Sequence, residues 1–307
     1  MGNQGKNFRA IHECKLLRNN ASSPFSVVPA LFRLIRPKQW VKNSFVLAPL
    51  VFAGQFTNLL AVSEALLATL LFSLASSAAY ILNDFHDIEH DRKHPIKSKR
   101  PLASGQVSKP QALVLFGALS GVLIWGYVQR PSVMLVIVAY LALSLSYTFV
   151  LKHQPVIDIF SIALGFVLRV YAGAVAISVS VSAWMFVTML CLALYLASVK
   201  RRQELRLSGR EGRLVLEQYS ITLVDRYAEM AATGALLFYS LFVLTVRPEM
   251  VISIPFVLYG LFRYWFVVEA CKRGESPADV LLSDWQLLTT VLIWLGICAW
   301  VLWPTGA

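Results

Sequence analysis

The sequence has little charge for its size. Of its 307 residues, 15% are Asp, Glu, Lys or Arg and 57% are hydrophobic, and the mean hydropathy is +0.62. Soluble domains carry roughly 25% charged residues, so this composition excludes an ordinary water-soluble fold. Cysteine is also scarce, and no pair has metal-ligand spacing (Cys14, Cys191, Cys271, Cys298). That scatter excludes a disulfide framework and a cysteine metal site.

What the chain has instead is a series of continuous apolar runs. Most are near the length of about 20 residues that crosses a bilayer, and none alternates as a barrel strand does. The sequence therefore predicts an all-α polytopic membrane protein with nine transmembrane helices. The first span is short and could begin near Trp40. The expected spans are about 43–57, 62–82, 110–128, 131–150, 156–177, 180–198, 228–246, 250–268 and 285–303.

The polar start of the chain precedes these spans. Residues 1–26 form a basic tail without the apolar core of a cleavable signal peptide. Apolar residues at helical spacing beside Arg33 and Arg36 predict an interfacial helix at 27–36, or else an extension of the first span. We expect residues 27–307 to form a single integral membrane catalytic domain.

The basic residues are divided unevenly between the two sides. If the N-terminus is cytoplasmic and the nine spans alternate, nearly all Lys and Arg residues lie on the cytoplasmic side. The other side holds Arg130 and Arg247. The positive-inside rule then places the N-terminus and the long charged segments in the cytoplasm. Binding of nucleic acid is not expected, because no soluble domain presents a face for it.

The stretch NDFHDIEHDRKHPIKSKRP, residues 83–101, concentrates charge at the end of one span. If the helix continues past residue 91, four oxygen-bearing side chains share one stripe and repel one another (Asn83, Asp84, Asp87, Asp91). Something positive should lie between them. One alternative is internal pairing with Arg92, Lys93 or Lys97. The other is Mg²⁺, which prefers a few carboxylates, waters and substrate phosphates. Lys97 and Arg100, on a loop able to fold back, would suit a diphosphate.

These residues resemble a known family. Asn83-Asp84-x-x-Asp87-x-x-x-Asp91, followed by Arg100-Pro101-Leu102-Ala103-Ser104-Gly105, is similar to the first aspartate-rich motif of the UbiA superfamily of intramembrane prenyltransferases. The resemblance covers nearly the whole chain. It implies a nine-helix bundle with a cytoplasm-facing cavity and a Mg²⁺ cofactor, with the catalytic acids Asp84, Asp87 and Asp91.

The chain departs from the usual family pattern after the sixth span. A second Asp-x-x-x-Asp motif is expected there, but residues 195–213 read YLASVKRRQELRLSGREGR. Asp225-x-x-x-Glu229 is a degenerate alternative about twenty residues later. A basic run in place of an acidic one favours phosphate binding, since Arg forks grip phosphate bidentately.

This basic segment, with RPKQWVKN at 36–43, resembles one branch of the superfamily, the decaprenyl-phosphate phosphoribosyltransferases. The resemblance implies transfer of 5-phosphoribosyl from phosphoribosyl diphosphate to a polyprenyl phosphate lipid, in the route to arabinose donors for the cell envelope. It leaves open the chain length of the lipid and whether a homo-oligomer forms. The expected phosphate-binding residues are Lys38, Lys42, Lys97, Arg100, Lys152, Lys200, Arg201 and Arg202.

Charges within or near the apolar spans suggest further cavity residues. A central Arg costs about 2.5–3.5 kcal/mol on insertion scales, so Arg169 should face the interior and have a partner. Asp158 lies three turns earlier on the same side, which suggests a shared cavity, although neighbouring carbonyl groups alone could satisfy Arg169. Tyr147 and Glu204 are further candidates, and capping is the favoured role of Asp279 and Asp284.

Two other functions compete with this interpretation. An aromatic prenyltransferase of the same fold would share the first motif but needs the second acidic cluster. A transporter of anionic solutes would show paired broken helices in two related halves. No internal repeat is evident, and an acidic cluster would oppose the passage of anions.

Overall fold

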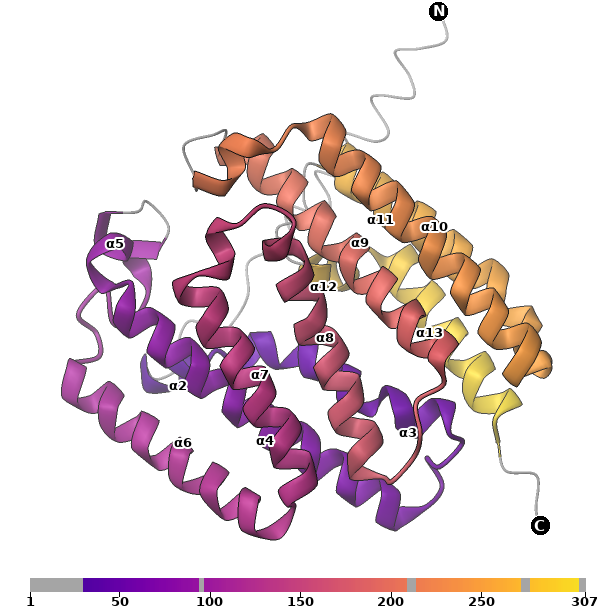
Figure 1. The fold of residues 1–307 in the computed structure, drawn as a ribbon, viewed down its shortest axis with the longest axis horizontal. Coiled ribbons are helices and arrows are strands. Elements are labelled where there is room, and N and C mark those ends of the chain that lie inside the picture. The colour runs from indigo at the N-terminus through magenta and orange to yellow at the C-terminus, as the bar shows by residue number, and fades with distance from the viewer. Residues whose placement is uncertain (1–29, 94–96, 209–213, 272–276, 304–307) are drawn as a thin grey trace, which may run out of the picture. The chain divides into compact units, whose positions relative to one another are not determined.

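The computed structural model describes residues 30–93, 97–208, 214–271 and 277–303. Every regular element within these ranges is a helix, which confirms the all-α prediction (Figure 1). The described chain divides into two compact units. We call residues 27–152 and 164–181 the first unit, and residues 153–163 and 182–307 the second unit.

The first unit is built around one long helix. Helix α4 (Leu59–His86) contacts α6 (Lys109–Gln129), α7 (Pro131–Phe149) and the N-terminal helix α2 (Ala30–Ile35). Local signals fix the helix starts. The Asn58 side chain accepts from the backbone N–H groups of Leu60 and Ala61, and Ser108 forms a capping box with Gln111. The short helix α5 (Ile88–Lys93) and the turn η2 (Lys97–Lys99) follow α4.

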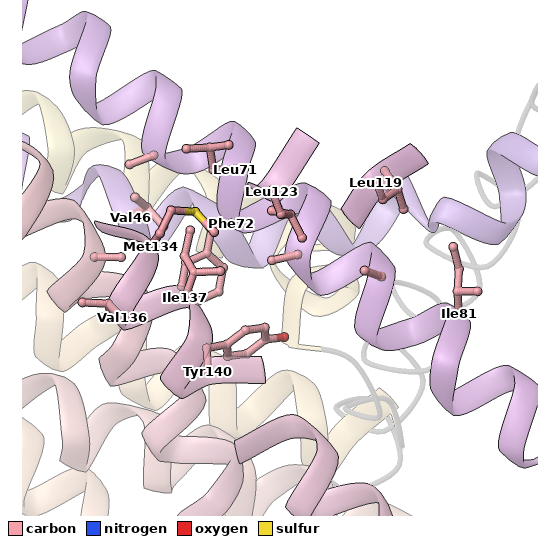
Figure 2. Packing of buried hydrophobic residues seen from close by; sticks show 14 of the residues in the cluster. Val46, Leu71, Phe72, Ile81, Leu119, Leu123, Met134, Val136, Ile137 and Tyr140 are labelled. Carbon is pink, nitrogen blue, oxygen red and sulfur yellow. The ribbon is translucent and has the colours of Figure 1, made fainter. Parts of the chain in front are cut away.

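The core of the first unit lies between α4, α6 and α7. Phe72 and Ile137 are fully buried there, and Tyr140 tilts against Phe72 with ring centroids 4.6 Å apart. Figure 2 shows these side chains converging with Leu71, Met134 and others of the cluster. The outward side of α6 is apolar instead, with Val114 74% exposed. Exposed apolar side chains along a helix this long suit lipid contact.

The second unit is formed mainly by α9 (Ala183–Ser208) and α10 (Ile221–Val246), which lie against each other. The turns η5 (Leu214–Gln218) and η6 (Pro248–Ser253), and the helices α11 (Ile254–Cys271), α12 (Pro277–Ser283) and α13 (Trp285–Val301), complete it. Asp284 accepts from the Leu287 backbone N–H, which confirms its capping role. The side chain of Asp279 lies outside the described residues. Helix α8 (Ile157–Ala176) begins in the second unit and ends in the first.

Seven helices of the described chain are long and apolar enough to cross a membrane. Two of the nine predicted spans are not among these seven helices. Helix α13, where the ninth span was predicted, has 17 residues. The predicted span at 43–57 is instead the 3₁₀-helix η1 (Pro37–Leu47) and the five-residue helix α3 (Ala48–Phe52). Pro49 lacks a backbone N–H, which helps to explain why no continuous α-helix forms. Because a 3₁₀-helix rises about 2.0 Å per residue, η1 and α3 together contain enough chain to extend roughly 30 Å.

Two other boundaries correct the sequence analysis. Helix α9 continues through Lys200, Arg201, Arg202 and Glu204, which lie beyond the end of the predicted span 180–198. Arg, Lys, Gln, Glu and Leu are strong helix formers, so the end of the apolar run does not end the helix. The helix expected to pass residue 91 is interrupted at Asp87 (φ −93°, ψ 7°) and resumes as α5.

The contact between α8 and η1 leaves no space for a side chain at Gly173. A Cβ added there would lie 1.8 Å from the Val46 carbonyl oxygen, which is backbone and cannot rotate away. We expect Gly173→Ala to lower the thermal unfolding temperature in detergent, at an overpacking cost of about 1–3 kcal/mol or more. Gly121→Ala on α6 is the matched control, because nothing lies within 4 Å of its added Cβ. That change should stabilise the helix. Equal melting of both variants would contradict the close contact.

Candidate functional site

The acidic motif at the end of α4 is neutralised by two arginines. Arg100 Nη1 donates to Asp84 Oδ1 at 3.1 Å and to Asp91 Oδ2 at 2.6 Å. Arg36 Nη2 donates to the same Asp84 oxygen. Asp84 and Asp91 are buried, at 2% and 1% exposure. The internal pairing considered from sequence therefore occurs, but with Arg36 and Arg100. The guanidinium of Arg92 instead donates to the Ala103 carbonyl.

The four oxygen-bearing residues do not act as one stripe in this geometry. Asp84 and Asp91 converge on Arg100, whereas Asn83 Oδ1 accepts a hydrogen bond from Thr148 on α7 at 3.2 Å. Asp87 is half-buried at the break between α4 and α5. The break allows Asp91 to reach the same guanidinium as Asp84.

Arg36 reaches Asp84 because the segment around it is fixed to α4. Its backbone is left-handed (φ 56°, ψ 55°), a conformation that costs a non-glycine residue roughly 1–2 kcal/mol. Trp40 Nε1 donates to Ser77 Oγ at 3.0 Å, and the same Oγ donates to the Ile35 carbonyl at 2.8 Å. The guanidinium of Arg36 also lies 5.0 Å from the ring centroid of Tyr80. These contacts hold the turn at residues 35–40 against the end of α4.

A buried network extends this anchor deeper into the first unit. Asn43 Nδ2 donates to Ser73 Oγ at 3.0 Å and Ser76 Oγ at 3.1 Å, and its Oδ1 accepts from Arg169 Nε at 2.8 Å. Arg169 also donates to the Gly165 carbonyl and the Tyr140 hydroxyl. Arg169 therefore has the interior partners that its position in an apolar helix requires. In this geometry it ties η1 to α4, α7 and α8.

The second unit contains another buried charge cluster, around Arg201 on α9. Its side chain has no exposed surface and pairs with Asp158 at 2.8 Å and with Glu204. Tyr219 donates to Asp158 Oδ1 at 2.6 Å and accepts from the Val156 backbone N–H. Burial, and then the hydrogen bond to Asp158, raise the pKa of Tyr219, so its hydroxyl stays protonated as a donor. Asp158 and Arg169 thus have separate partners, unlike the shared cavity expected from sequence.

The neighbouring Arg202 is also neutralised. It pairs with Asp225 and with Glu269 at 2.5 Å, and its guanidinium lies 5.1 Å from the Trp265 ring centroid. Only 4% of its side chain is exposed. The expected phosphate-binding role of Arg201 and Arg202 therefore has no support in this geometry. Lys200 differs, because its side chain is 32% exposed and its Nζ is 3.9 Å from Glu204.

The remaining predicted residues lie at helix ends and turns. Lys38 is exposed and Lys42 half-buried on η1, and Lys97 is half-buried on η2. Tyr147 near the end of α7 and Lys152 on the turn η3 (Leu151–His153) are half-buried. All five belong to the first unit.

The profile of the UbiA prenyltransferase family matches residues 44–288. The chain belongs to the UbiA prenyltransferase family. A UbiA homolog from Archaeoglobus fulgidus, solved bound to GPP and Mg²⁺, has the same fold, with a TM-score of 0.68 at 18% identity. The match covers 89% of this chain and 99% of that chain.

Two relatives named decaprenyl-phosphate phosphoribosyltransferase are considerably more similar. The protein from Mycobacterium tuberculosis is 35% identical over 288 residues, which cover 89% of this chain and 94% of that protein. The protein from Mycolicibacterium smegmatis is 32% identical, covering 94% of this chain and 96% of that protein.

Asp84 and Asp91, the acid pair of this UbiA family member, fit a hard divalent cation. Asp84 Oδ2 and Asp91 Oδ1 are buried and have no hydrogen-bond partner among the described residues. Among all the residues that the structure describes, no group of three or more His, Cys, Asp or Glu side chains is placed to hold a metal ion. Magnesium needs only one or two carboxylates when waters and substrate phosphates supply its other ligands. Two carboxylates, each with one unpartnered oxygen, meet that need.

Arg36 is the site residue that sequence reasoning missed. It was noted as part of RPKQWVKN, but the expected phosphate ligands in that motif were Lys38 and Lys42. The left-handed turn before Pro37 directs Arg36 back to Asp84, which is 48 residues away. The Arg36-Pro37 dipeptide was the available signal, since a helix usually ends at or before the residue that precedes a proline.

Substitutions at Asp158 and Arg201 test whether this buried ion pair stabilises the second unit. Asp158→Asn would remove the fully buried one of the two acids that pair with Arg201 and leave Glu204, so the loss should be no more than the about 3–5 kcal/mol that breaking a buried pair costs. We expect a clear drop in unfolding temperature, much of it recovered in the double variant Asp158→Leu/Arg201→Met, in which apolar side chains replace the buried pair, as measured by thermal unfolding in detergent. Glu249→Gln is the matched control, because the Arg247–Glu249 pair is exposed and 3.7 Å long. Similar losses from the two single changes would refute the proposed role.

Proposed function

We propose that the protein transfers a 5-phosphoribosyl group from phosphoribosyl diphosphate to a polyprenyl phosphate and releases diphosphate. The observation that carries this proposal is its 32–35% identity to decaprenyl-phosphate phosphoribosyltransferases along nearly the whole chain. The acid pair with its arginines adds a chemical reason, because it offers carboxylate oxygens for a metal and guanidinium groups for phosphate at one helix end.

The proposed reaction exchanges one bond at the ribose for another. An oxygen of the lipid phosphate forms a bond to ribose C1, and the bond from C1 to the diphosphate oxygen breaks, so that diphosphate leaves with the electron pair. A phosphate monoester already presents an anionic oxygen, so no strong general base is needed. The catalytic requirement is stabilisation of the charge that develops on the leaving group.

We assign the leaving diphosphate to the end of α4. Asp84, Asp91 and Asp87, with Asn83 nearby, would hold Mg²⁺, which when bound neutralises charge on the departing phosphates. Arg100 and Lys97 would bind the diphosphate oxygens. We assign the other phosphate groups to exposed or half-buried lysines of the first unit, Lys38, Lys42 and Lys152, and Lys200 of the second unit is a separate candidate.

We further propose that this site faces the cytoplasm. The asymmetry of Lys and Arg residues supports that orientation, and phosphoribosyl diphosphate is a soluble, highly charged molecule that cannot cross lipid. The polyprenyl phosphate would keep its headgroup at the interface and its tail among apolar helices.

The alternative is transfer of a prenyl group from a prenyl diphosphate to an aromatic acceptor. It is supported by the shared fold of the A. fulgidus homolog solved with GPP and Mg²⁺. The lack of an Asp-x-x-x-Asp motif in residues 195–213, where that chemistry would use one, favours the phosphoribosyl reaction.

A purified-protein assay separates the two reactions. With Mg²⁺, radiolabelled phosphoribosyl diphosphate and a polyprenyl phosphate, we expect label to enter the organic phase, and EDTA should abolish the transfer. Transfer from a prenyl diphosphate to 4-hydroxybenzoate, with no phosphoribosyl transfer, would establish the alternative.

A single substitution tests the acidic motif without removing a buried ion pair. We expect Asp87→Asn to lower kcat/KM on the order of 100-fold, as loss of a metal-associated carboxylate does, with little change in unfolding temperature. Glu89→Gln on α5 is the matched control, because Glu89 is an exposed acid in the same segment. If both variants keep full activity, Asp87 has no part in the site.

A further inference from the structure

Arg36 and Arg100 cancel the negative charge of Asp84 and Asp91. Two buried carboxylates and two guanidinium groups sum to zero, and each ion pair is within hydrogen-bond distance. A divalent cation approaching Asp84 and Asp91 therefore meets a neutral cluster and is repelled by two cations at close range. Coulomb interactions at such distances are strong where water is largely excluded.

The same arginines leave one oxygen of each acid available. They bind Oδ1 of Asp84 and Oδ2 of Asp91, while Asp84 Oδ2 and Asp91 Oδ1 have no hydrogen-bond partner among the described residues. Each carboxylate thus has one unpartnered oxygen for a cation that the local charge disfavours. A ligand that brings additional negative charge removes this conflict, because it attracts both the cation and the guanidinium groups.

Arg36 is positioned for this role by its backbone rather than by chance contact. The left-handed turn, the Trp40–Ser77 hydrogen bond and the Tyr80 ring all fix its guanidinium at Asp84. Arg33, one turn earlier, provides a contrast, since its exposed side chain donates to Gln106 at 2.8 Å and touches neither acid.

We propose that Arg36 and Arg100 make the acid pair accept a divalent cation together with a diphosphate group rather than before it. This inference rests on the proposed function and specifies its binding order. Arg36 is a positioning residue that acts by holding the Asp84 carboxylate and by its charge. In the loaded form Asp84 and Asp91 would hold the cation, and the positive charge of the two guanidinium groups would attract the diphosphate.

Binding measurements without turnover test the proposal. The full-length protein in detergent is titrated with Mn²⁺ alone, with bound metal followed by loss of the free-ion electron paramagnetic resonance signal. Labelled inorganic diphosphate is measured separately by equilibrium dialysis, with and without Mg²⁺. We expect weak Mn²⁺ binding to the wild type, and diphosphate binding that requires Mg²⁺.

Arg36→Gln should then change the two ligands in opposite directions. We expect at least tenfold tighter binding of Mn²⁺ alone and at least tenfold weaker binding of diphosphate with Mg²⁺. Arg36→Lys, which retains the charge, should still bind Mn²⁺ alone weakly. Arg33→Gln removes an equal charge from the same segment and should match the wild type in both measurements.

Several outcomes would overturn the binding order. The binding order would be wrong if wild-type protein bound Mn²⁺ as tightly without diphosphate as with it. Arg36→Gln protein that binds Mn²⁺ no better than wild type would remove the role of Arg36. Because these probes are a metal and inorganic diphosphate, the order can hold even if phosphoribosyl transfer fails, and transfer can succeed even if the order is wrong.

Discussion

The guanidinium of Arg100, bound to both Asp84 and Asp91, is the interaction on which the candidate site depends. Two carboxylates at the end of an apolar helix repel each other and lose hydration, so they can be buried together only with positive charge between them. Arg100 supplies that charge from the turn after α5, which follows the acids in the sequence. Arg36 supplies more from the turn before η1, which precedes them. The acids, α4, α5 and the N-terminal turn are thereby brought to one place.

A second constraint keeps this arrangement in register. A guanidinium can bind Asp84 from residue 36 only if η1 is fixed along α4. Small serine side chains on α4 let η1 approach closely, Asn43 bonds to two of them, and Arg169 bonds to Asn43. Gly173 permits a similarly close approach of α8 to the backbone of η1. The buried Arg169 is therefore better explained by anchoring than by ligand binding.

Hydropathy predicted the spans best where apolar character and helix end together. The predicted runs 110–128 and 131–150 differ from α6 and α7 by a single residue at any end. Hydropathy could not find the charged end of α9 or the charged start of α10. It detects apolar segments, whereas these charged turns are helical outside the apolar run. Nor could it separate η1 from an α-helix. The acidic motif and the nearby Arg100 were recognisable from residue spacing, but Arg36 was not recognisable as a partner, since Arg36 and Asp84 are 48 residues apart.

The basic run at 200–202 shows why charge alone does not identify a phosphate site. Successive residues on a helix point about 100° apart, so Lys200, Arg201 and Arg202 cannot form one cationic surface. Arg201 instead meets Asp158 and Glu204, and Arg202 meets Asp225 and Glu269. Glu204 is three residues from Arg201, but Asp158, Asp225 and Glu269 come from other parts of the chain and were not evident in the local pattern. A buried arginine must have such partners because the desolvation penalty of an isolated charge is too large. An anion-binding arginine must instead be accessible to its ligand, and by that criterion the end of α4 is the better candidate for a phosphate site. There Arg100 and Arg36 are about a quarter exposed, while the acids they hold are not.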